Sequence, residues 1–514
     1  MSRLVVVSNR VLPAGGVACA GGLAVALTAA LRGRPCLWFG WSGERVARYT
    51  GEVSVRRTDD IEVATLDLDE ADYAEYYNGY ANGALWPLFH SRTDLTDYDG
   101  AFNEGYRRVN RRFAEALIPQ LRAGDQIWIH DYHLIPLGQE LRELGFVGPI
   151  GFFLHIPWPA PQLFATLPRH RELAEAMFAY DLVGFQTREH AEAFEAYVLG
   201  EAGGGRENGR LKAFGKSISI GDFPIGLDTP EFLEAAASPT ALQTYDRMAA
   251  HGLFRSLIVG VDRLDYSKGI EERLLGFERY LEAQPGRARR VQYLQIAPSS
   301  REAVEAYQDL RDRVLALAGR INAMWADFDH TPMQCVNRNY SREELAGIYR
   351  AARVGLVTPL RDGMNLVAKE YVAAQDPADP GVLILSRFAG AATQMKDALI
   401  VNPYSRDEVA AALETALGMG RPERIARWEG LMAGVARDTV QSWRDDFLAA
   451  LAAARAPWRE APQRAALSIG PSDSHGFLKA RDLSGQTRFF QDRGAERGDA
   501  GPRRPAPALR HPEA

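Results

Sequence analysis

A strand, a glycine turn and a helix start carry the residues of this chain that are best suited to chemistry. Residues 354–358 are apolar, which predicts a short buried strand that Pro359 ends. Gly363 supplies a turn, and residues 366–374 predict a helix. The first N–H groups of such a helix attract an anion. Asp362 and Glu370 bracket that point, so the stretch suits a ligand with both phosphate and hydroxyl groups, although an ordinary strand–helix turn has the same pattern.

Cationic side chains follow further predicted strands of the second half of the chain. Arg263 and Lys268 stand five residues apart in a loop after the strand predicted at 257–261, and Arg301 follows the strand predicted at 291–297. Strands of open α/β sheets bind ligands at their carboxyl ends. A phosphate-bearing ligand in a crevice between two sheets explains these cations together better than separate surface salt bridges do.

Polar residues also end two predicted strands of the first half. Asp131 follows the strand that begins at Gln126, and His155 lies at the end of the strand 150–156. His130 and His133 beside Asp131 suggest a metal at first sight, but their spacing matches no zinc pattern and no second ligand cluster supports one. We therefore expect no metal and no cofactor, and we interpret Asp131 as a hydroxyl acceptor paired with His155.

The elements that must position these residues alternate between strands and helices along the chain. The predicted elements of the first half include a strand at 4–8, a helix at 23–31, a helix at 101–121 and a strand at 181–185, while residues 200–218 are rich in glycine and charge and predict an exposed loop. The aromatic segment 73–90 suits either sugar binding or packing. The alternation restarts at 257–261, which places a domain boundary near 230–250.

Composition narrows the class of protein. The 514 residues, 46% hydrophobic and 25% charged, predict a soluble protein of more than one domain. The net charge of −6 gives no reason to expect nucleic acid, and no apolar run is long enough for a membrane span. Three cysteines without CxxC spacing favour a reducing compartment, so we expect a cytoplasmic protein. Residues 456–514 have little apolar periodicity, and we expect a disordered tail.

The motifs together resemble those of the trehalose-6-phosphate synthases, a family of retaining glucosyltransferases. The resemblance covers residues 1–455 and rests on LVVVSNR, AGGLAVAL, LWFGWSGE, LWPLFH, IWIHDYHL, GFFLHIPWP, GFQT, VDRLDYSKGI, QIAPSSR and TPLRDGMNLVAKEYVAAQDP. It implies the α/β GT-B architecture, in which two Rossmann-like doubly wound domains face each other across a deep cleft. We assign 1–235 to an acceptor domain and 236–455 to a donor domain, whose last helix can return to the first domain.

The resemblance also implies a role for each candidate residue. Arg263 and Lys268 would stabilise the departing diphosphate, Asp362 and His155 would hold glucose hydroxyls, and these four form the predicted catalytic set. The implied donor-binding set is Gly22, Arg263, Lys268, Tyr340, Asp362, Gly363, Met364, Asn365, Leu366, Val367 and Glu370. The implied acceptor-binding set is Arg10, Tyr77, Trp86, Asp131 and Arg301. Tyr340 stands where the family often carries Phe, which leaves the donor base open between uridine and guanosine, and Trp158 also replaces a more usual Phe.

The implied reaction moves glucose from a nucleotide-glucose donor to glucose 6-phosphate by front-face displacement and gives α,α-trehalose 6-phosphate and a nucleoside diphosphate. UDP-glucose is the donor that we favour. No residue of the donor pocket resembles a dedicated nucleophile. The rivals are a related transferase acting on another phosphorylated acceptor (a glucosylglycerol-phosphate synthase or a pseudo-glycosyltransferase), a glycoside hydrolase, which would need no cations, a phosphatase and a sugar-phosphate sensor. We expect small-molecule partners, and the sequence allows a homodimer or homotetramer.

Overall fold

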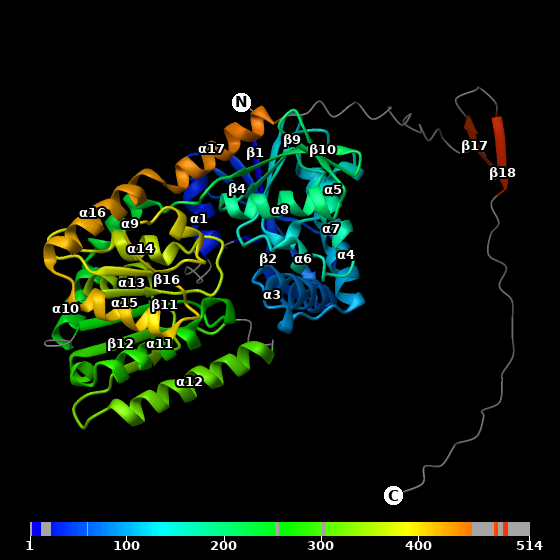
Figure 1. Cartoon of the computed structure of the whole chain (residues 1–514). Coiled ribbons are helices and arrows are strands. Elements are labelled where there is room, and N and C mark those ends of the chain that lie inside the picture. Colours follow the sequence, from blue (N-terminus) through cyan, green and yellow to red (C-terminus); the bar gives the residue numbers. More distant parts are fainter. Residues whose placement is uncertain are drawn as a thin grey trace, which may run out of the picture. The chain divides into compact units, whose positions relative to one another are not determined.

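The computed structural model describes residues 3–11, 22–58, 60–251, 256–300, 305–454, 477–481 and 487–491. The chain divides into two compact units, Met1–Pro457 and Trp458–Ala514. The first unit contains two α/β sheets, which we call the N-half (residues 3–222) and the C-half (residues 256–437). Figure 1 shows the N-half in blue to cyan-green and the C-half in green to yellow.

The N-half is built on a ten-stranded sheet of order β3-β4-β2-β1-β5-β6-β7-β10-β9-β8. The strands are β1 (Leu4–Arg10), β2 (Cys36–Val46), β3 (Ser54–Thr58), β4 (Ile61–Asp69), β5 (Gln126–His130), β6 (Ile150–Phe153), β7 (Leu182–Phe185), β8 (Gly205–Glu207), β9 (Arg210–Ala213) and β10 (Lys216–Asp222). The helices are α1 (Gly22–Leu31), α2 (Glu70–Asp72), η1 (Tyr73–Leu85), α3 (Trp86–Phe89), α4 (Gly100–Leu117), α5 (Leu137–Glu143), α6 (Pro161–Phe164), α7 (His170–Met177) and α8 (Arg188–Gly200). The strands from β4 to β10 pair in parallel, and antiparallel pairs occur at both edges.

The C-half is built on six parallel strands of order β13-β12-β11-β14-β15-β16. The strands are β11 (Ser256–Val261), β12 (Val291–Ile296), β13 (Met333–Val336), β14 (Val354–Val357), β15 (Val382–Ser386) and β16 (Leu399–Val401). The helices are α11 (Ile270–Ala283), α12 (Glu305–Trp325), α13 (Arg342–Ala351), α14 (Leu366–Ala373), α15 (Arg406–Gly418) and α16 (Arg421–Arg437). Two helices, α9 (Thr229–Ala236) and α10 (Pro239–His251), precede β11.

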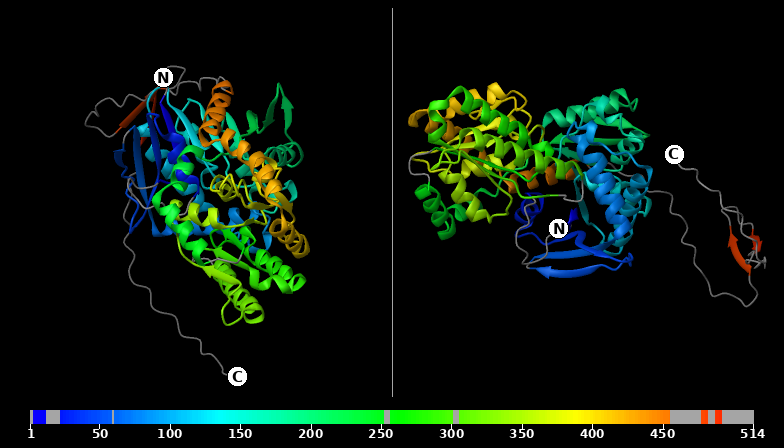
Figure 2. Two further views of the ribbon diagram at one scale, coloured as in Figure 1. Left: turned by 90° about the vertical axis from the view of Figure 1, so that its left-hand side faces the viewer. Right: turned by 90° about the horizontal axis from the view of Figure 1, so that it is seen from below.

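The inner strands of both sheets are buried on both faces, as doubly wound sheets require. Successive side chains of a strand point to opposite faces. In β11, Ile258 packs into the core that contains α11, α12 and α15, whereas Val259 packs into the core that contains α13 and α14. In β1, Val5 and Val6 likewise pack into the cores on opposite faces of the sheet, and both are fully buried. Figure 2 shows helices around the strands from two further directions. The predicted fold of two Rossmann-like domains is confirmed.

The last helix of the first unit, α17 (Val440–Ala453), packs on the N-half. Its Trp443 and Phe447 rings lie 4.8 Å and 4.9 Å from the ring of Trp128 on β5. The chain crosses between the halves twice, and the two crossings lie side by side. Leu227 forms a parallel β-bridge with Thr439, and a Cβ on Gly226 would collide with the backbone of Asp438. Figure 1 shows α17, in orange, beside α1. The predicted boundary at 235/236 stays a prediction.

The predicted exposed loop at 200–218 is wrong, because this segment forms the antiparallel strands β8 and β9 and the start of β10. Asn208 and Gly209 have φ values of 52° and 78°, and Phe214 and Gly215 have φ values of 52° and 73°. Two consecutive residues with positive φ make the two-residue turn that suits a β-hairpin, and Asn-Gly is its strongest sequence signal. Glycine and charge here mark tight turns between short strands.

The aromatic segment that follows β4 forms an unusual helix. Residues Tyr73–Leu85 make η1, a π-helix of 13 residues, which continues directly into α3. π-Helical turns are rare and occur often at functional sites. The wider turn points Tyr76 into the core and leaves Tyr77 partly exposed, so packing accounts for part of this aromatic segment.

The second unit contains one described element, a hairpin of β17 (Phe477–Arg481) and β18 (Thr487–Gln491) in antiparallel register, with Phe477 opposite Gln491. The remainder of 456–514, on which the predicted disorder falls, lies outside the described residues. None of the described helices is long and apolar enough to cross a membrane.

Candidate active site

The turn between β14 and α14 lies where the sequence predicts it, and backbone hydrogen bonds fix its shape. The N–H of Leu360 donates to the Ser267 carbonyl at 2.8 Å, and the N–H of Asp362 donates to the Phe388 carbonyl at 3.1 Å. Asn365 takes a left-handed conformation with φ of 79° and caps α14, since its side chain accepts from the Ala368 N–H. The first N–H groups of α14, at Leu366 and Val367, therefore point out of the helix into the turn.

Helix α14 is held in place by a buried lysine. The Lys369 ammonium donates to the Ile225 carbonyl and to Gln394 Oε1, both at 2.8 Å, and its side chain is 2% exposed. Burial lowers the pKa of Lys369 to about 8, and Asp438 opposes that effect. Because Ile225 and Asp438 lie at the two chain crossings between the halves, Lys369 ties α14 to the junction of the N-half and the C-half.

Asp362 and Lys268 form an ion pair at this turn. Lys268 Nζ lies 2.5 Å from Asp362 Oδ2, and each side chain is 13% exposed. The Asn365 side chain donates to the same oxygen at 3.1 Å. Burial raises the pKa of Asp362, but the Lys268 charge and these hydrogen bonds outweigh it and hold that pKa below its usual value. The Asp362 carboxylate is therefore ionised at neutral pH.

The loop after β11 supplies Lys268 together with Arg263. The Arg263 side chain is 33% exposed, and its Nη2 atom lies 3.6 Å from Oδ2 of the buried Asp265. Asp265 fixes the loop by accepting from the Ser267 N–H at 3.0 Å and from its hydroxyl at 2.9 Å. Gly269 ends the loop with φ of 61°, and a Cβ there would lie 2.6 Å from the Thr358 carbonyl. The loop therefore depends on glycine to reach β14.

The N-half contributes His155 and Asp131 from neighbouring strands. Asp131 takes φ of 75°, and its carboxylate accepts from the His155 N–H at 3.2 Å. His155 Nε2 lies 3.0 Å from His130 Nδ1, and Gln186 Nε2 lies 3.3 Å from His155 Nδ1. Burial lowers the pKa of His155 to about 3 and lowers the pKa of His130 as well. Both imidazoles are neutral at physiological pH.

The two halves touch at the turn between β14 and α14. A Cβ on Gly363 would lie 1.9 Å from the His155 carbonyl oxygen, so only glycine allows this approach. Trp86 Nε1 donates to Asp265 Oδ1 at 3.4 Å, and the Arg263 guanidinium lies 5.5 Å from the centre of the Trp86 ring. The structure thus joins Trp86, predicted on the acceptor side, to the loop predicted on the donor side.

The other predicted acceptor residues gather around Trp41. The Arg10 guanidinium lies 5.7 Å from the Trp41 ring centre, and the Tyr77 ring lies 5.6 Å from it. Tyr77 also stacks on His133 at 5.8 Å with an interplanar angle of 12°. A Cβ on Gly43 would collide with the Arg10 guanidinium, so that glycine leaves room for it. Arg301 lies outside the described residues.

Most of the predicted donor-binding residues lie on or before the helices of the C-half, and Gly22 lies in the N-half. Glu370 is in the second turn of α14, and burial raises its pKa to about 7 against the opposing effects of Arg342 and Tyr349. Tyr340 precedes α13, and the Arg338 guanidinium lies 5.1 Å from its ring centre. Met364 is buried and accepts from the Ala391 N–H at 2.8 Å. Gly22 is the first residue of α1.

Comparison with known proteins identifies the family. The sequence profile of Glycosyltransferase family 20 matches residues 17–453. This chain belongs to glycosyltransferase family 20. A trehalose-6-phosphate synthase of Sinorhizobium fredii is 47% identical over 456 residues, which cover 87% of this chain and 98% of that protein. One of Cronobacter sakazakii is 45% identical over 470 residues, which cover 91% and 99%.

Solved structures agree with the family assignment. An α,α-trehalose-phosphate synthase (UDP-forming) of Burkholderia xenovorans in complex with glucose-6-phosphate has a TM-score of 0.85 and 47% identity, covering 88% of this chain and all of that chain. A trehalose-6-phosphate protein of E. coli bound with UDP-2-fluoro glucose has a TM-score of 0.83 and 46% identity, covering 88% and 99%. The resemblance inferred from the motifs is confirmed.

Two histidines that the sequence did not single out lie beside the ion pair of Lys268 and Asp362 in this family 20 chain. Burial lowers the pKa of His90 to about 4, and the charges of Asp265, Lys268 and Asp362 also act on it. Burial lowers the pKa of His190 to about 3, where Asp362 and His90 act on it too. His90 ends the motif LWPLFH, and this motif was the sequence feature that pointed to it. Its position close to Lys268 depends on how the two halves pack and does not follow from the motif.

Metal ligands do not gather at this site in the part of the chain that the structure describes, where no three His, Cys, Asp or Glu side chains are placed to hold a metal ion. His130 and His133, the two histidines that suggested a metal site in the sequence, contact other aromatic side chains. His130 contacts His155, and His133 stacks against Tyr77 and Tyr132.

Proposed function

We propose that this chain transfers glucose from UDP-glucose to glucose 6-phosphate with retention at the anomeric carbon, giving α,α-trehalose 6-phosphate and UDP. The family and the names of its relatives support this activity, and they favour glucose 6-phosphate over the other phosphorylated acceptors. The structural observation that carries the proposal is the ion pair of Lys268 with Asp362 before the N-terminus of α14, at the turn that faces His155, with Arg263 on the same loop as Lys268.

In this mechanism the C-half stabilises the leaving group. Arg263, Lys268 and the N–H groups of Leu366 and Val367 would bind the diphosphate as the bond between the anomeric carbon and the phosphate oxygen breaks. Gly22 would let the N-half approach the donor, and Glu370 would accept hydrogen bonds from the ribose hydroxyls. Tyr340 would lie at the base. The electron pair of the breaking bond goes to the departing phosphate oxygen.

The N-half would position the acceptor and the glucosyl group. Arg10, Tyr77, Trp86 and Arg301 would bind the acceptor phosphate, Asp131 would orient acceptor hydroxyls, and His155 and Asp362 would hold hydroxyls of the transferred glucose. The incoming hydroxyl would give its proton to the departing phosphate oxygen on the same face. This assignment suits the site, because Asp362 is engaged by Lys268 and Asn365, and His155 is neutral.

One end-point assay tests the proposal. Purified protein is incubated with glucose 6-phosphate and either UDP-glucose or GDP-glucose, and nucleoside diphosphate and disaccharide phosphate are both measured. We expect equimolar UDP and trehalose 6-phosphate, with less product from GDP-glucose. Release of glucose without disaccharide would indicate a hydrolase, and product formation only with another phosphorylated acceptor would overturn the proposed specificity.

The cytoplasm is the location that we propose, because the described cysteines Cys36 and Cys335 form no disulfide and burial raises the pKa of Cys36 to about 12. Such a thiol is unreactive and persists in a reducing compartment. A homodimer or homotetramer stays a prediction that light scattering on the purified chain would check.

A further inference from the structure

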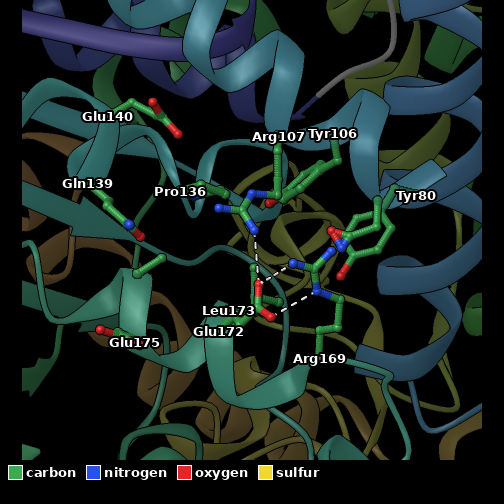
Figure 3. A pocket seen from close by; sticks show the side chains of 12 residues that line it. Tyr80, Tyr106, Arg107, Pro136, Gln139, Glu140, Arg169, Glu172, Leu173 and Glu175 are labelled. Carbon is green, nitrogen blue, oxygen red and sulfur yellow. Dashed lines mark hydrogen bonds and ion pairs between the residues drawn. The ribbon is translucent and has the colours of Figure 1, made fainter. Parts of the chain in front are cut away.

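A second pocket lies in the N-half, apart from the residues assigned to the transfer reaction. Its volume is about 230 Å³, and its walls come from η1, α4, α5, α7 and the loops next to them. Figure 3 shows these side chains around the opening. None of the predicted catalytic, donor-binding or acceptor-binding residues lines it.

The first feature that points to a ligand is a phenol at the pocket wall. Tyr80 is 5% exposed and lines the pocket, as does the neighbouring Tyr106, which donates to the Tyr132 carbonyl at 2.6 Å. Arg107, Arg169 and Glu172 all act on the Tyr80 phenol, so its hydroxyl lies among polar groups at the pocket wall.

The second feature is the arrangement of charges. Arg107 Nη1 lies 2.9 Å and Arg169 Nη2 lies 2.8 Å from the same carboxylate oxygen of Glu172, as the dashed lines of Figure 3 show. Glu140 and Glu175 line the opposite side. A phosphate between the arginines would meet the Glu172 carboxylate, and three carboxylates outnumber two guanidinium groups. The lining therefore disfavours a phosphorylated ligand.

The lining suits a neutral ligand rich in hydroxyl groups. Fixed pairs of Arg donors and a Glu acceptor match hydroxyls, which both donate and accept. Asn103 and Gln139 add planar amides, and the rings of Tyr80 and Tyr106, 4.6 Å apart, add an aromatic wall for the C–H face of a sugar. Pockets for drug-sized ligands begin near 300 Å³, so a cavity of about 230 Å³ suits a smaller ligand, such as one sugar ring. We propose that this pocket is a second carbohydrate site that binds a neutral monosaccharide or one ring of a neutral disaccharide.

The pocket is also connected to the acceptor side of the active site. Tyr106 packs on Tyr76 with ring centres 5.9 Å apart, and the Tyr76 hydroxyl donates to Asn9 Oδ1 at 2.7 Å, next to Arg10. Tyr77 and Tyr80 stand on the same π-helix. A sugar bound at Tyr80 therefore shifts the position of η1, which also carries Tyr77. Because of this shift, the KM for glucose 6-phosphate should change by about fivefold or more, which is the low end of measured couplings between sites.

Calorimetry on the full chain tests the site. Glucose, maltose and trehalose are titrated into protein saturated with UDP and glucose 6-phosphate, so that the active site is occupied. We expect at least one sugar to bind the wild type, Asn103→Trp to lose that binding by filling the pocket, and Glu104→Trp to keep it. Glu104 is the matched control, because it is the next residue of α4, is exposed and does not line the pocket.

Two further measurements sharpen the test. Tyr80→Phe removes only the hydroxyl and should weaken binding about fivefold, as the loss of one neutral hydrogen bond predicts. The KM for glucose 6-phosphate should respond to the sugar in the wild type and in Glu104→Trp, but not in Asn103→Trp. Absence of sugar binding to the wild type, binding that survives in Asn103→Trp, or binding of inorganic phosphate in place of sugars would overturn the proposed site. An unchanged KM with sugar bound would overturn the coupling.

Discussion

The two halves present opposite chemistry where they meet. On the C-half, charged pairs gather at the strand ends, with Lys268 on Asp362 and the fully buried Arg273 2.7 Å from Asp262. On the N-half, buried histidines gather instead, and burial keeps His130, His155 and His190 neutral at physiological pH. The C-half side of the site holds buried ion pairs, whereas the N-half side combines neutral imidazoles with the Arg10 guanidinium and the Asp131 carboxylate.

This difference separates the two tasks of the proposed reaction. Charge that develops on a leaving diphosphate needs fixed cations in a site that excludes water, and the C-half provides them. A sugar acceptor needs hydrogen bonds that place one hydroxyl, and neutral imidazoles and aromatic rings provide these without competing for the diphosphate. If the comparison holds, substitutions in the C-half should lower turnover and those in the N-half should weaken acceptor binding.

The largest effect is expected for Lys268→Ala. Loss of one group that stabilises developing charge typically costs about 10²–10³ in rate, and this substitution also leaves the Asp362 carboxylate without its cation. We expect kcat to fall in that range with little change in the KM for glucose 6-phosphate. Steady-state kinetics with each substrate varied is the measurement, and Lys212→Ala is the control because Lys212 is 57% exposed on β9. An unchanged kcat would reject the role of Lys268 in leaving-group stabilisation.

In the N-half, a smaller effect is expected for Arg10→Ala, on the KM for glucose 6-phosphate. A hydrogen bond to a charged group contributes about 1.5–3 kcal/mol, so the KM for glucose 6-phosphate should rise roughly 10- to 100-fold at nearly constant kcat. Arg188→Ala is the matched control, because Arg188 is an N-half arginine that is 81% exposed. A fall in kcat without a rise in that KM would mean that charge on the N-half also serves the chemical step.

The pKa of Glu370 predicts a pH dependence of donor binding. Its carboxylate, with a pKa of about 7 in the free protein, must be ionised to accept hydrogen bonds from the ribose. Between pH 6 and pH 8 the ionised fraction rises about tenfold, so the KM for UDP-glucose should fall by up to that factor. Glu370→Gln should remove this dependence. The initial-rate pH profile of both proteins measures it, and a KM that is flat in the wild type contradicts the proposed role.

The smallest effect is on stability at acid pH. The folded state lowers the pKa of His190 from 6.5 to about 3, so this group contributes stability that is fully present above about pH 6.5 and is lost as the pH falls toward 3. His190→Gln cannot take up a proton in the unfolded state. Its melting temperature should therefore fall less between pH 7 and pH 4.5 than that of the wild type. Equal falls in thermal denaturation scans would show that His190 is not a source of acid sensitivity.

The sequence predicted those features that depend on neighbours along the chain. The strand before Pro359, the Gly363 turn and helix α14 appear where the apolar runs and turn residues place them, and α4 begins within one residue of its predicted start. The Asn208-Gly209 turn was equally local, so the misassigned loop at 200–218 reflects a signal that was present but given too little weight.

Tertiary structure alone decided which of these residues meet. Lys268 and Asp362 are 94 residues apart in the chain, and His155 and Gly363 come from different halves, yet each pair is in contact. The neutral state of His90 and His190 likewise arises from burial by distant segments. The spacing of apolar and polar residues along the chain determines where strands and helices form. The burial of a side chain and its contacts depend on how distant elements pack together, which this spacing does not specify.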